Sequence, residues 1–479
     1  MTTPARLLLT VIIALIAAQA ANAKLRLHHL VSDNMVIQQL AEARLWGWDT
    51  PGKKVTVKVS WSADRHSAVA DASGLWQVKV KTPQASHKPL SITFSDGTDR
   101  ITVSNVLAGE VWVCGGQSNM EMGVRGYDGC PVEGANQTIA EASRYPGIRI
   151  AKVPAKMSAA PLADTDVSWQ VSSPACVGRA SAVAYNFAKT LNVSLDVPVG
   201  IILTYKGATR CESWLNAPNI KALTQEPTDS AEIAKQFQQP EIRPVLWGNG
   251  TFSPVSRYTV RGITFYQGCG NVGNPQGYYT KLLSALAKQW RSDFGLGDIP
   301  FYFVQIAPFA YGDPSGDAAA KLRADQFEAS KVIPNSGIVC TQDLVYVHEV
   351  NQIHPAQKRQ VGERLAYLAM SGQYGLTELM SQSPSFKSMT VSGDSCIISL
   401  DNLYGSTNLM SGLKGFEVAG ADSVFHTAEA SWCQGKGVIV TCTEVKKPVA
   451  VRYCWHNFML GNVANLAGLP LFPFRTDSW

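Results

Sequence analysis

The sequence has few charged residues and no concentrated block of either sign. Charged side chains make up 16% of the 479 residues, and the formal net charge is +5 at pH 7. No run of lysines and arginines is present of the kind that follows a phosphate backbone, which argues against nucleic acid as a partner. The hydrophobic content of 46% is instead typical of a globular chain long enough for more than one domain.

Long hydrophobic runs are absent after the N-terminus. Residues 1–23 contain one arginine, an apolar stretch from 7 to 18, and small residues before Lys24. This is the layout of a secretory signal peptide, and the apolar stretch is short for a membrane span. No later segment is apolar enough to cross a bilayer. We therefore expect a protein without a membrane span that is secreted, or delivered to a lysosome-like lumen, after cleavage at about residue 23.

The close cysteine and histidine spacing of a zinc site is also missing. None of the ten cysteines belongs to a CxxC pair or a compact Cys/His cluster. In an oxidising compartment an even number of cysteines favours disulfides, and Cys433 and Cys442 could close a hairpin, although the connectivity stays open. Three Asn-x-Ser/Thr sequons, at Asn136, Asn192 and Asn249, are potential glycan acceptors.

Three regions differ in their pattern of strands and helices. Residues 24–108 consist of short alternating runs separated by turn residues and predict a β-sandwich domain. Strand-like and helical segments alternate over 109–384, and the β pattern returns over 385–479 as a β-rich C-terminal domain. The chain has no internal repeats and no low-complexity linkers. We therefore expect the domains to pack against one another.

The middle region predicts a mostly parallel sheet with helices on both faces. Buried strands are expected at 109–116, 197–207, 260–268, 299–307 and 336–344, and helices at 179–191, 277–290 and 355–370. The helical segments carry apolar residues on one stripe, for example Val183, Phe187 and Leu191. Alternation of this kind is typical of an α/β fold.

Polar or glycine-rich segments follow three of these strands. They are GGQSNM at 115–120, KGAT at 206–209 and YQGCGN at 266–271, and a fourth segment, NQIHP at 351–355, enters the last helix. Ligands of open parallel sheets bind at the carboxyl ends of the strands. We therefore expect a single edge of the sheet to carry Ser118, Gly207, Gln267 and His354.

This set contains the groups that acyl transfer needs. A serine hydroxyl becomes nucleophilic when an imidazole takes its proton, and these roles fall to Ser118 and His354. The N–H groups of Ser118 and Gly207 and the side-chain amide of Gln267 are candidate donors to the oxyanion. Structural alternatives remain: Ser118 could cap a turn, His354 could start a helix, and Gln267 could satisfy buried backbone groups. His348 is a second candidate base, but it lacks the position at the helix entry.

At these residues the chain resembles the sialate O-acetylesterases, a branch of the SGNH hydrolases. The family's nucleophile block is matched by GQSNM and its histidine block by IHPAQKRQV. KGATRCESW, YQGCGN and LRADQ at 322–326 are similar to further family segments. The resemblance runs from about residue 25 to the C-terminus. It implies an SGNH-type, flavodoxin-like parallel sheet flanked by helices, with β-rich N-terminal and C-terminal regions.

The resemblance also implies an activity. It points to a secreted serine esterase that removes O-acetyl groups from sialic acids through an acetyl-Ser118 intermediate, with His354 as the base and with no metal or other cofactor. It further implies substrate-binding roles for Asn119, Arg323 and Gln326. Two alternatives remain open. One is an esterase acting on other acetylated glycans such as acetyl xylan, and the other is a catalytically silent glycan-binding protein.

The third member of a catalytic triad is missing from its usual place. Asn351 stands three residues before His354, where many SGNH hydrolases carry an aspartate. A neutral side chain can orient an imidazole, but it cannot stabilise imidazolium as a carboxylate does. We expect either a Ser–His dyad or a carboxylate from elsewhere on the loop, with Asp343 or Glu349 as the candidate orienter.

Two further positions depart from the family pattern. Cys269 stands where the family usually has glutamate, which leaves Arg323 in need of another partner or free to contact the substrate. Ala208 replaces the second glycine of the KGAT block. With both departures, it remains open whether the chain is a family member with lowered activity or with none.

Overall fold

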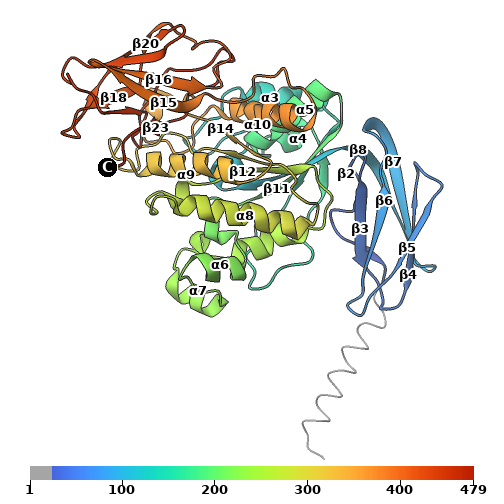
Figure 1. The fold of residues 1–479 in the computed structure, drawn as a ribbon. Helices are drawn as coiled ribbons and strands as arrows, with labels where there is room; N and C mark the ends of the chain where they lie inside the picture. Colours follow the sequence, from blue (N-terminus) through green and yellow to red (C-terminus); the bar gives the residue numbers. More distant parts are fainter. Residues whose placement is uncertain (1–23) are drawn as a thin grey trace, which may run out of the picture.

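The structure is a computed structural model that describes residues 24–479, so the predicted signal peptide at 1–23 lies outside the described residues. Two β-rich regions lie at opposite ends of a central α/β body (Figure 1). The α/β class and the β-rich terminal regions are therefore confirmed. Across residues 24–479 we find no helix with the length and apolar character that a membrane crossing requires.

The N-terminal region consists of two sheets that pack face to face. One contains β1 (Arg26–Leu27), β3 (Glu42–Trp48) and β6 (Leu75–Lys81), and the other contains β2 (Val36–Gln38), β4 (Lys54–Val59), β5 (Arg65–Val69), β7 (Ser86–Ser95) and the start of β8 (Arg100–Gly116). Alternate residues of these strands are buried, as expected for sheets with one apolar face. The ring centroids of Trp76 and Phe94, from β6 and β7, lie 5.7 Å apart between the two sheets.

Strand β8 joins this region to the central sheet. Its first part pairs antiparallel with β7, and its last seven residues, 110–116, pair parallel with β11 (Val199–Tyr205). The domain boundary expected at residue 108 falls inside this strand. A continuous strand, with no linker, therefore connects the two regions.

The central sheet is mainly parallel and has the strand order β10-β9-β11-β8-β12-β13-β14. The remaining members are β9 (Ile148–Lys152), β10 (Trp169–Val171), β12 (Gly262–Tyr266), β13 (Phe301–Val304) and β14 (Ser336–Val339). Only the edge strand β10 runs antiparallel to its neighbour in this path through the described residues. Strands β9 and β10 were not predicted from the sequence, whereas the other five were.

Long helices cover both faces of this sheet (Figure 1). Helices α5 (Ala182–Leu195) and α10 (Lys358–Gln373) share one core with each other, and α8 (Tyr278–Phe294) and α9 (Ala318–Val332) share the other. The predicted stripe of Val183, Phe187 and Leu191 is fully buried. Helix α10 begins three residues later than predicted, at Lys358, and Gln357 before it has the non-helical angles φ -82° and ψ 68°.

Short helices occupy the connections, and the C-terminal region is built from strands. The helices are α2 (Ser118–Glu121), α3 (Ala135–Glu141), α4 (Pro174–Val177), α6 (Ala217–Leu223) and α7 (Ser230–Gln236). One C-terminal sheet contains β15 (Ser385–Ser392), β16 (Ser395–Asp401), β21 (Gly437–Thr441), β20 (Glu429–Cys433) and β17 (Ser411–Leu413), and the other contains β19 (Phe425–Thr427), β18 (Phe416–Ala419), β22 (Ala450–Tyr453) and β23 (Phe474–Arg475).

The expectation of disulfides is wrong for this structure. All ten cysteines lie within residues 24–479, and all are free. The hairpin between Cys433 and Cys442 does form, as β20 and β21. Its register pairs Cys433 with Gly437 and Glu429 with Thr441. The two cysteines therefore lie at opposite ends of the hairpin.

The three sequons differ in accessibility. Asn136 is exposed on α3, whereas Asn192 and Asn249 are each 8% exposed. The side-chain amide of Asn192 donates to the carbonyl of Val197 at 2.7 Å, and that of Asn249 donates to the backbone of 158–159. Of these three, only Asn136 presents an amide that a glycan could extend.

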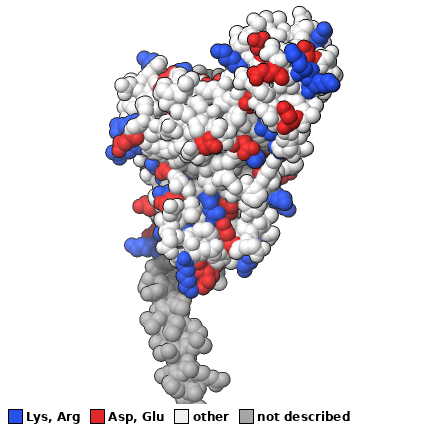
Figure 2. Space-filling view, turned by 90° about the vertical axis from the view of Figure 1, so that its left-hand side faces the viewer, with Lys and Arg blue, Asp and Glu red and all other residues white. Residues whose placement is uncertain are grey.

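The surface charge agrees with the composition. On the face shown in Figure 2, basic and acidic side chains lie singly or in small groups of both signs. No broad area of one sign is visible on that face.

The contact between α5 and α10 leads to a stability prediction. A Cβ at Gly362 would lie 2.4 Å from the carbonyl oxygen of Val183, a backbone atom that cannot move without shifting α5. We expect Gly362→Ala to lower the free energy of unfolding by about 1–3 kcal/mol, measured by urea denaturation. Arg359→Ala, at an exposed position of the same helix, serves as the control and should have little effect. Equal stability of the two variants would contradict the tight helix contact.

Candidate active site

The predicted nucleophile lies where β8 ends and α2 begins. Gly116 has φ +137°, and a Cβ there would lie 2.2 Å from the carbonyl oxygen of Tyr266, so only glycine allows β8 and β12 to approach this closely. The N–H of Gln117 donates to the same carbonyl at 3.0 Å, and its Oε1 accepts the N–H of Gly268 at 2.8 Å. These contacts fasten the turn to the end of β12. Ser118 follows them as the first residue of α2 and is partly exposed.

The Gly207 backbone lies next to Ser118. A Cβ at Gly207 would lie 3.4 Å from Cβ of Ser118 and 3.1 Å from Oε2 of Glu121. The N–H of Gly207 donates to this Glu121 oxygen at 2.5 Å. The predicted oxyanion donor is therefore adjacent to the nucleophile, but a carboxylate of the chain itself holds it. The neighbouring Ala208 adopts φ +63°, a left-handed conformation that costs a non-glycine residue about 1–2 kcal/mol.

His354 lies on the loop before α10, close to the Ser118 turn. The side-chain amide of Asn119 donates to the carbonyl of Ile353 at 3.0 Å. The ring of Tyr127 lies 5.2 Å from the ring of His354 between centroids, and its hydroxyl donates to the carbonyl of Ser118 at 3.3 Å. Two separate contacts thus connect the serine turn with the histidine loop. Within residues 24–479 the Ser118 hydroxyl and the imidazole make no direct hydrogen bond.

The imidazole of His354 is held in its neutral form. Burial, and then the nearby ammonium of Lys358, lower the pKa of His354 to about 4. Its Nε2 atom is buried and has no hydrogen-bond partner in the described part of the chain. A neutral ring nitrogen of this kind can accept a proton from a hydroxyl.

Asp343, which we predicted to orient this imidazole, is engaged by another side chain. Both carboxylate oxygens of Asp343 accept from the guanidinium of Arg364, at 2.7 and 2.6 Å. The carboxylate of Glu349 accepts the backbone N–H groups of Tyr346 and Ala356, each at 2.8 Å. Both acids are engaged by other groups, and no carboxylate hydrogen-bonds to the His354 ring over residues 24–479.

The residues at the usual aspartate position do not replace it. Asn351 is exposed. The side-chain oxygen of Gln352 accepts the backbone N–H of His354 at 3.3 Å and lies 3.1 Å from Sγ of Cys130. These contacts hold the loop backbone and leave the imidazole without an acidic partner.

Gln267, the third predicted oxyanion donor, is buried and hydrogen-bonded inside the protein. Its Nε2 donates to the carbonyl of Thr209 at 3.2 Å and to Oδ1 of Asn271 at 2.9 Å. Its Oε1 accepts the hydroxyl of Tyr279 at 2.6 Å. The amide is 1% exposed, and both of its hydrogens are used inside the protein.

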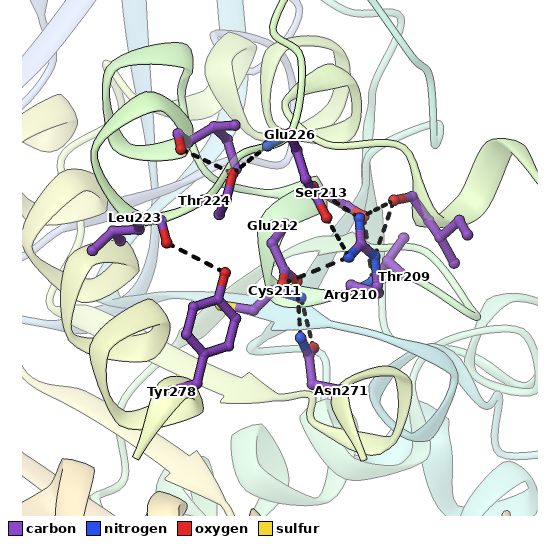
Figure 3. Close-up of polar contacts among 12 residues, drawn as sticks. Thr209, Arg210, Cys211, Glu212, Ser213, Leu223, Thr224, Glu226, Asn271 and Tyr278 are labelled. Carbon is purple, nitrogen blue, oxygen red and sulfur yellow. Dashed lines mark hydrogen bonds and ion pairs between the residues drawn. The ribbon is translucent and has the colours of Figure 1, made fainter. Parts of the chain in front are cut away.

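A polar network continues from Gln267 through Asn271, and Figure 3 shows the part of it around Asn271, Glu212 and Arg210. Oδ1 of Asn271 accepts the N–H of Cys211 at 2.9 Å, and its Nδ2 donates to Glu212 at 2.8 Å. Arg210 lies between Glu212, at 3.6 Å, and Glu226, with which it forms two hydrogen bonds of 2.7 and 3.0 Å. Burial raises the pKa of Glu212, and the Arg210 charge opposes that rise. This network joins the segment after β12 to the segment that carries Gly207.

The three predicted substrate-binding residues are also buried. Asn119, Arg323 and Gln326 are each at most 1% exposed. Gln326 donates to the carbonyl of Gln267 at 3.0 Å, and Arg323 donates to backbone carbonyls of the segment 454–456 in the C-terminal region. These side chains form hydrogen bonds within the protein, and their contact with the substrate stays a prediction.

Three residues of the site were not identified from the sequence. Lys358 stands inside the IHPAQKRQV block, four residues after His354, and Glu121 directly follows the GQSNM block, three residues after Ser118, so this proximity was the available signal. Tyr127 comes from an irregular loop, and no pattern marks it. Within the described residues, no group of three or more His, Cys, Asp or Glu side chains could hold a metal ion.

Comparison with known proteins gives concordant results. Residues 108–371 match a family model described as carbohydrate esterase, sialic acid-specific acetylesterase. Sialate O-acetylesterase of Homo sapiens is 27% identical over 402 residues, covering 77% of this chain and 75% of that protein. The mouse sialate O-acetylesterase is 26% identical over 446 residues, covering 80% of each. A crystal structure of a novel carbohydrate acetylesterase from Xanthomonas citri has 31% sequence identity and a TM-score of 0.84, covering 95% of this chain and 100% of that chain.

The Asp343–Arg364 pair predicts a structural role for Asp343. The Arg364 side chain is 10% exposed and would lose its charged partner in Asp343→Asn. We expect this variant to lower the free energy of unfolding by about 1–3 kcal/mol in urea denaturation. Asp401→Asn, which breaks the exposed pair with Lys387, is the matched control and should change stability little. A loss no greater than that of the control would argue against this role.

Proposed function

Since the chain belongs to the sialic acid-specific acetylesterase family of carbohydrate esterases, we propose that it removes O-acetyl groups from sialic acids with Ser118 as nucleophile and His354 as base. Its activity is that of a carboxylic-ester hydrolase. The observation that carries the mechanism is the placement of Ser118 beside the Gly207 N–H and the His354 loop. We further propose that the mature protein is secreted or lumenal.

The order of the central strands supports the SGNH-type assignment within this proposal. Numbered along the chain, β8, β11, β12, β13 and β14 have the spatial order 2-1-3-4-5. This is the order of flavodoxin-like sheets, whose ligands bind beside the first strand at its carboxyl end. Ser118 follows that end of β8, and β9 and β10 extend the sheet beyond β11.

The reaction proceeds through an acetyl-enzyme. Nε2 of His354 takes the proton from the Ser118 hydroxyl while the oxygen bonds to the acetyl carbon. The imidazolium then gives this proton to the departing sugar oxygen as the ester bond breaks. A water molecule, deprotonated by the same imidazole, attacks the acetyl group, and acetate leaves as Ser118 regains its proton.

Two backbone N–H groups are the proposed oxyanion donors. The N–H of Ser118 has no hydrogen-bond partner within residues 24–479, and that of Gly207 is held by Glu121. The carboxylate must therefore withdraw before Gly207 can donate to the developing oxyanion. The loss of such a donor typically costs about 2.7–4 kcal/mol of transition-state stabilisation.

The nucleophile and the base are tested by acetate release from 9-O-acetylated sialic acid. Wild type should release acetate, and Ser118→Ala and His354→Asn should each reduce kcat by about a thousandfold or more. His348→Asn provides the matched control and should retain activity. Hydrolysis of this substrate by wild type at the same rate as by Ser118→Ala would reject the sialate esterase proposal and leave the esterase on other acetylated glycans and the silent glycan-binding protein.

An acetylated neutral glycan is the second candidate substrate. The solved carbohydrate acetylesterase from Xanthomonas citri matches 95% of this chain with 31% identity. In addition, Arg323, which could have paired with the sialic acid carboxylate, is completely buried. Faster Ser118-dependent acetate release from acetylated xylan than from the sialic acid would favour this candidate.

The Glu121 contact predicts a variant with higher activity. Glu121→Gln removes the negative charge that competes with the oxyanion for the Gly207 N–H and keeps the shape of the side chain. We expect kcat/KM to rise about fivefold, because a hydrogen bond to a charged group is roughly 1 kcal/mol stronger than a neutral one. Steady-state kinetics with p-nitrophenyl acetate measure this change. A fall in kcat/KM would mean that Glu121 supports the loop and that Gly207 is not a donor.

A further inference from the structure

A buried lysine connects the two halves of the proposed site. Lys358, the first residue of α10, is 1% exposed. Its Nζ donates to Oδ1 of Asn119 at 2.8 Å and to the carbonyl of Pro355 at 2.7 Å. One ammonium group therefore contacts both the serine turn and the histidine loop.

Asn119 completes this connection from the other side. Its amide nitrogen donates to the carbonyl of Ile353 at 3.0 Å while its oxygen accepts from Lys358. Ile353 and Pro355 are the two chain neighbours of His354, and Asn119 is the chain neighbour of Ser118. The pair Asn119–Lys358 thus holds the backbone on each side of the base to the residue next to the nucleophile.

The ammonium has no carboxylate partner within residues 24–479. The titratable groups around it are Cys269, Glu349 and Cys130. Burial raises the pKa of the Cys269 thiol, which is therefore uncharged, and Glu349 is engaged by backbone N–H groups. The ring of Tyr127 packs against the other side of His354, and burial also raises the pKa of its hydroxyl. Lys358 is therefore the cation that acts on the imidazole.

We propose that Lys358 is a positioning residue that takes over the orienting task of the missing aspartate, tying the histidine loop to the serine turn and keeping the imidazole neutral. This inference rests on the proposed Ser118–His354 chemistry. It assigns the lysine an electrostatic effect opposite to that of a triad carboxylate, which favours imidazolium.

The titration ranges of the two groups agree with this role. Burial lowers the pKa of Lys358 to about 7, and burial together with Lys358 lowers the pKa of His354 to about 4. Over the pH range in which His354 titrates, Lys358 therefore carries its charge. The base stays unprotonated, and the site stays competent, in a mildly acidic medium.

The pH dependence of kcat/KM tests the proposal. In Lys358→Met the acidic limb should move upward by about 0.5–1 pH unit, because the cation no longer opposes protonation of His354. The plateau value of kcat should fall at least about tenfold, because the link between the loops is lost. Arg359→Met removes the neighbouring exposed cation and should leave both quantities unchanged. A merely structural lysine would lower kcat without moving the acidic limb.

A second measurement does not depend on activity or on the folding of the variant. Proton NMR titration of the wild-type histidines, with His354 assigned by comparison with His354→Asn, should give a ring pKa of about 4. A value at or above the ordinary 6.5 would overturn the inference. So would a folded Lys358→Met enzyme with Ser118-dependent activity and an unmoved acidic limb. Absence of Ser118-dependent activity in wild type would reject the proposed function instead, and the same titration of Lys358→Met would still decide the role of Lys358, because the ring pKa of His354 should rise when the cation is removed.

Discussion

The close approach of β8 and β12 at Gly116 is the constraint on which the site depends. With no side chain at this position, the carbonyl of Tyr266 reaches the β8 backbone and the N–H of Gln117. Ser118 is then delivered to the edge of the sheet beside Gly207. The contacts that surround it are almost all buried and internal. The protein therefore devotes most of its polar side chains in this area to holding the backbone, and leaves few of them for a substrate.

The use of polar side chains for internal contacts explains what the sequence could and could not predict. The positions of Ser118 and Gly207 were expected from where apolar strands end, because parallel strands place those ends at one edge, and that of His354 from the segment that enters the last helix. The direction of an amide in a glycine-rich loop is set by partners distant in the chain. For this reason Gln267 was assigned to the oxyanion, although it hydrogen-bonds to Asn271 and Tyr279. The five strands around β8 were similarly visible as apolar runs, whereas the short edge strands β9 and β10 were not.

The expectations of disulfides and of an Asp343–His354 contact, which the structure does not confirm, have a related cause. An even number of cysteines suggests an oxidising compartment, but whether two cysteines form a disulfide depends on where the fold places them. Here the strand register separates Cys433 from Cys442. Asp343 lies a few residues before the histidine loop, yet the nearby Arg364 binds both of its oxygens. No carboxylate hydrogen-bonds to the His354 ring within residues 24–479, and burial together with Lys358 lowers the pKa of His354 to about 4.

Strand β8 runs without a break from the N-terminal region into the central sheet. This affects where the chain can be cut into separate parts. A cut at residue 108 would divide one strand whose first part pairs with β7 and β2 and whose last part pairs with β11, and it would split a hydrophobic core that both regions share. The N-terminal sheets are thus an integral part of the esterase fold. They differ from an accessory module that is attached by a flexible linker. Gene fusions and shortened forms of such a protein would need to keep the N-terminal sheets together with the region that carries the site.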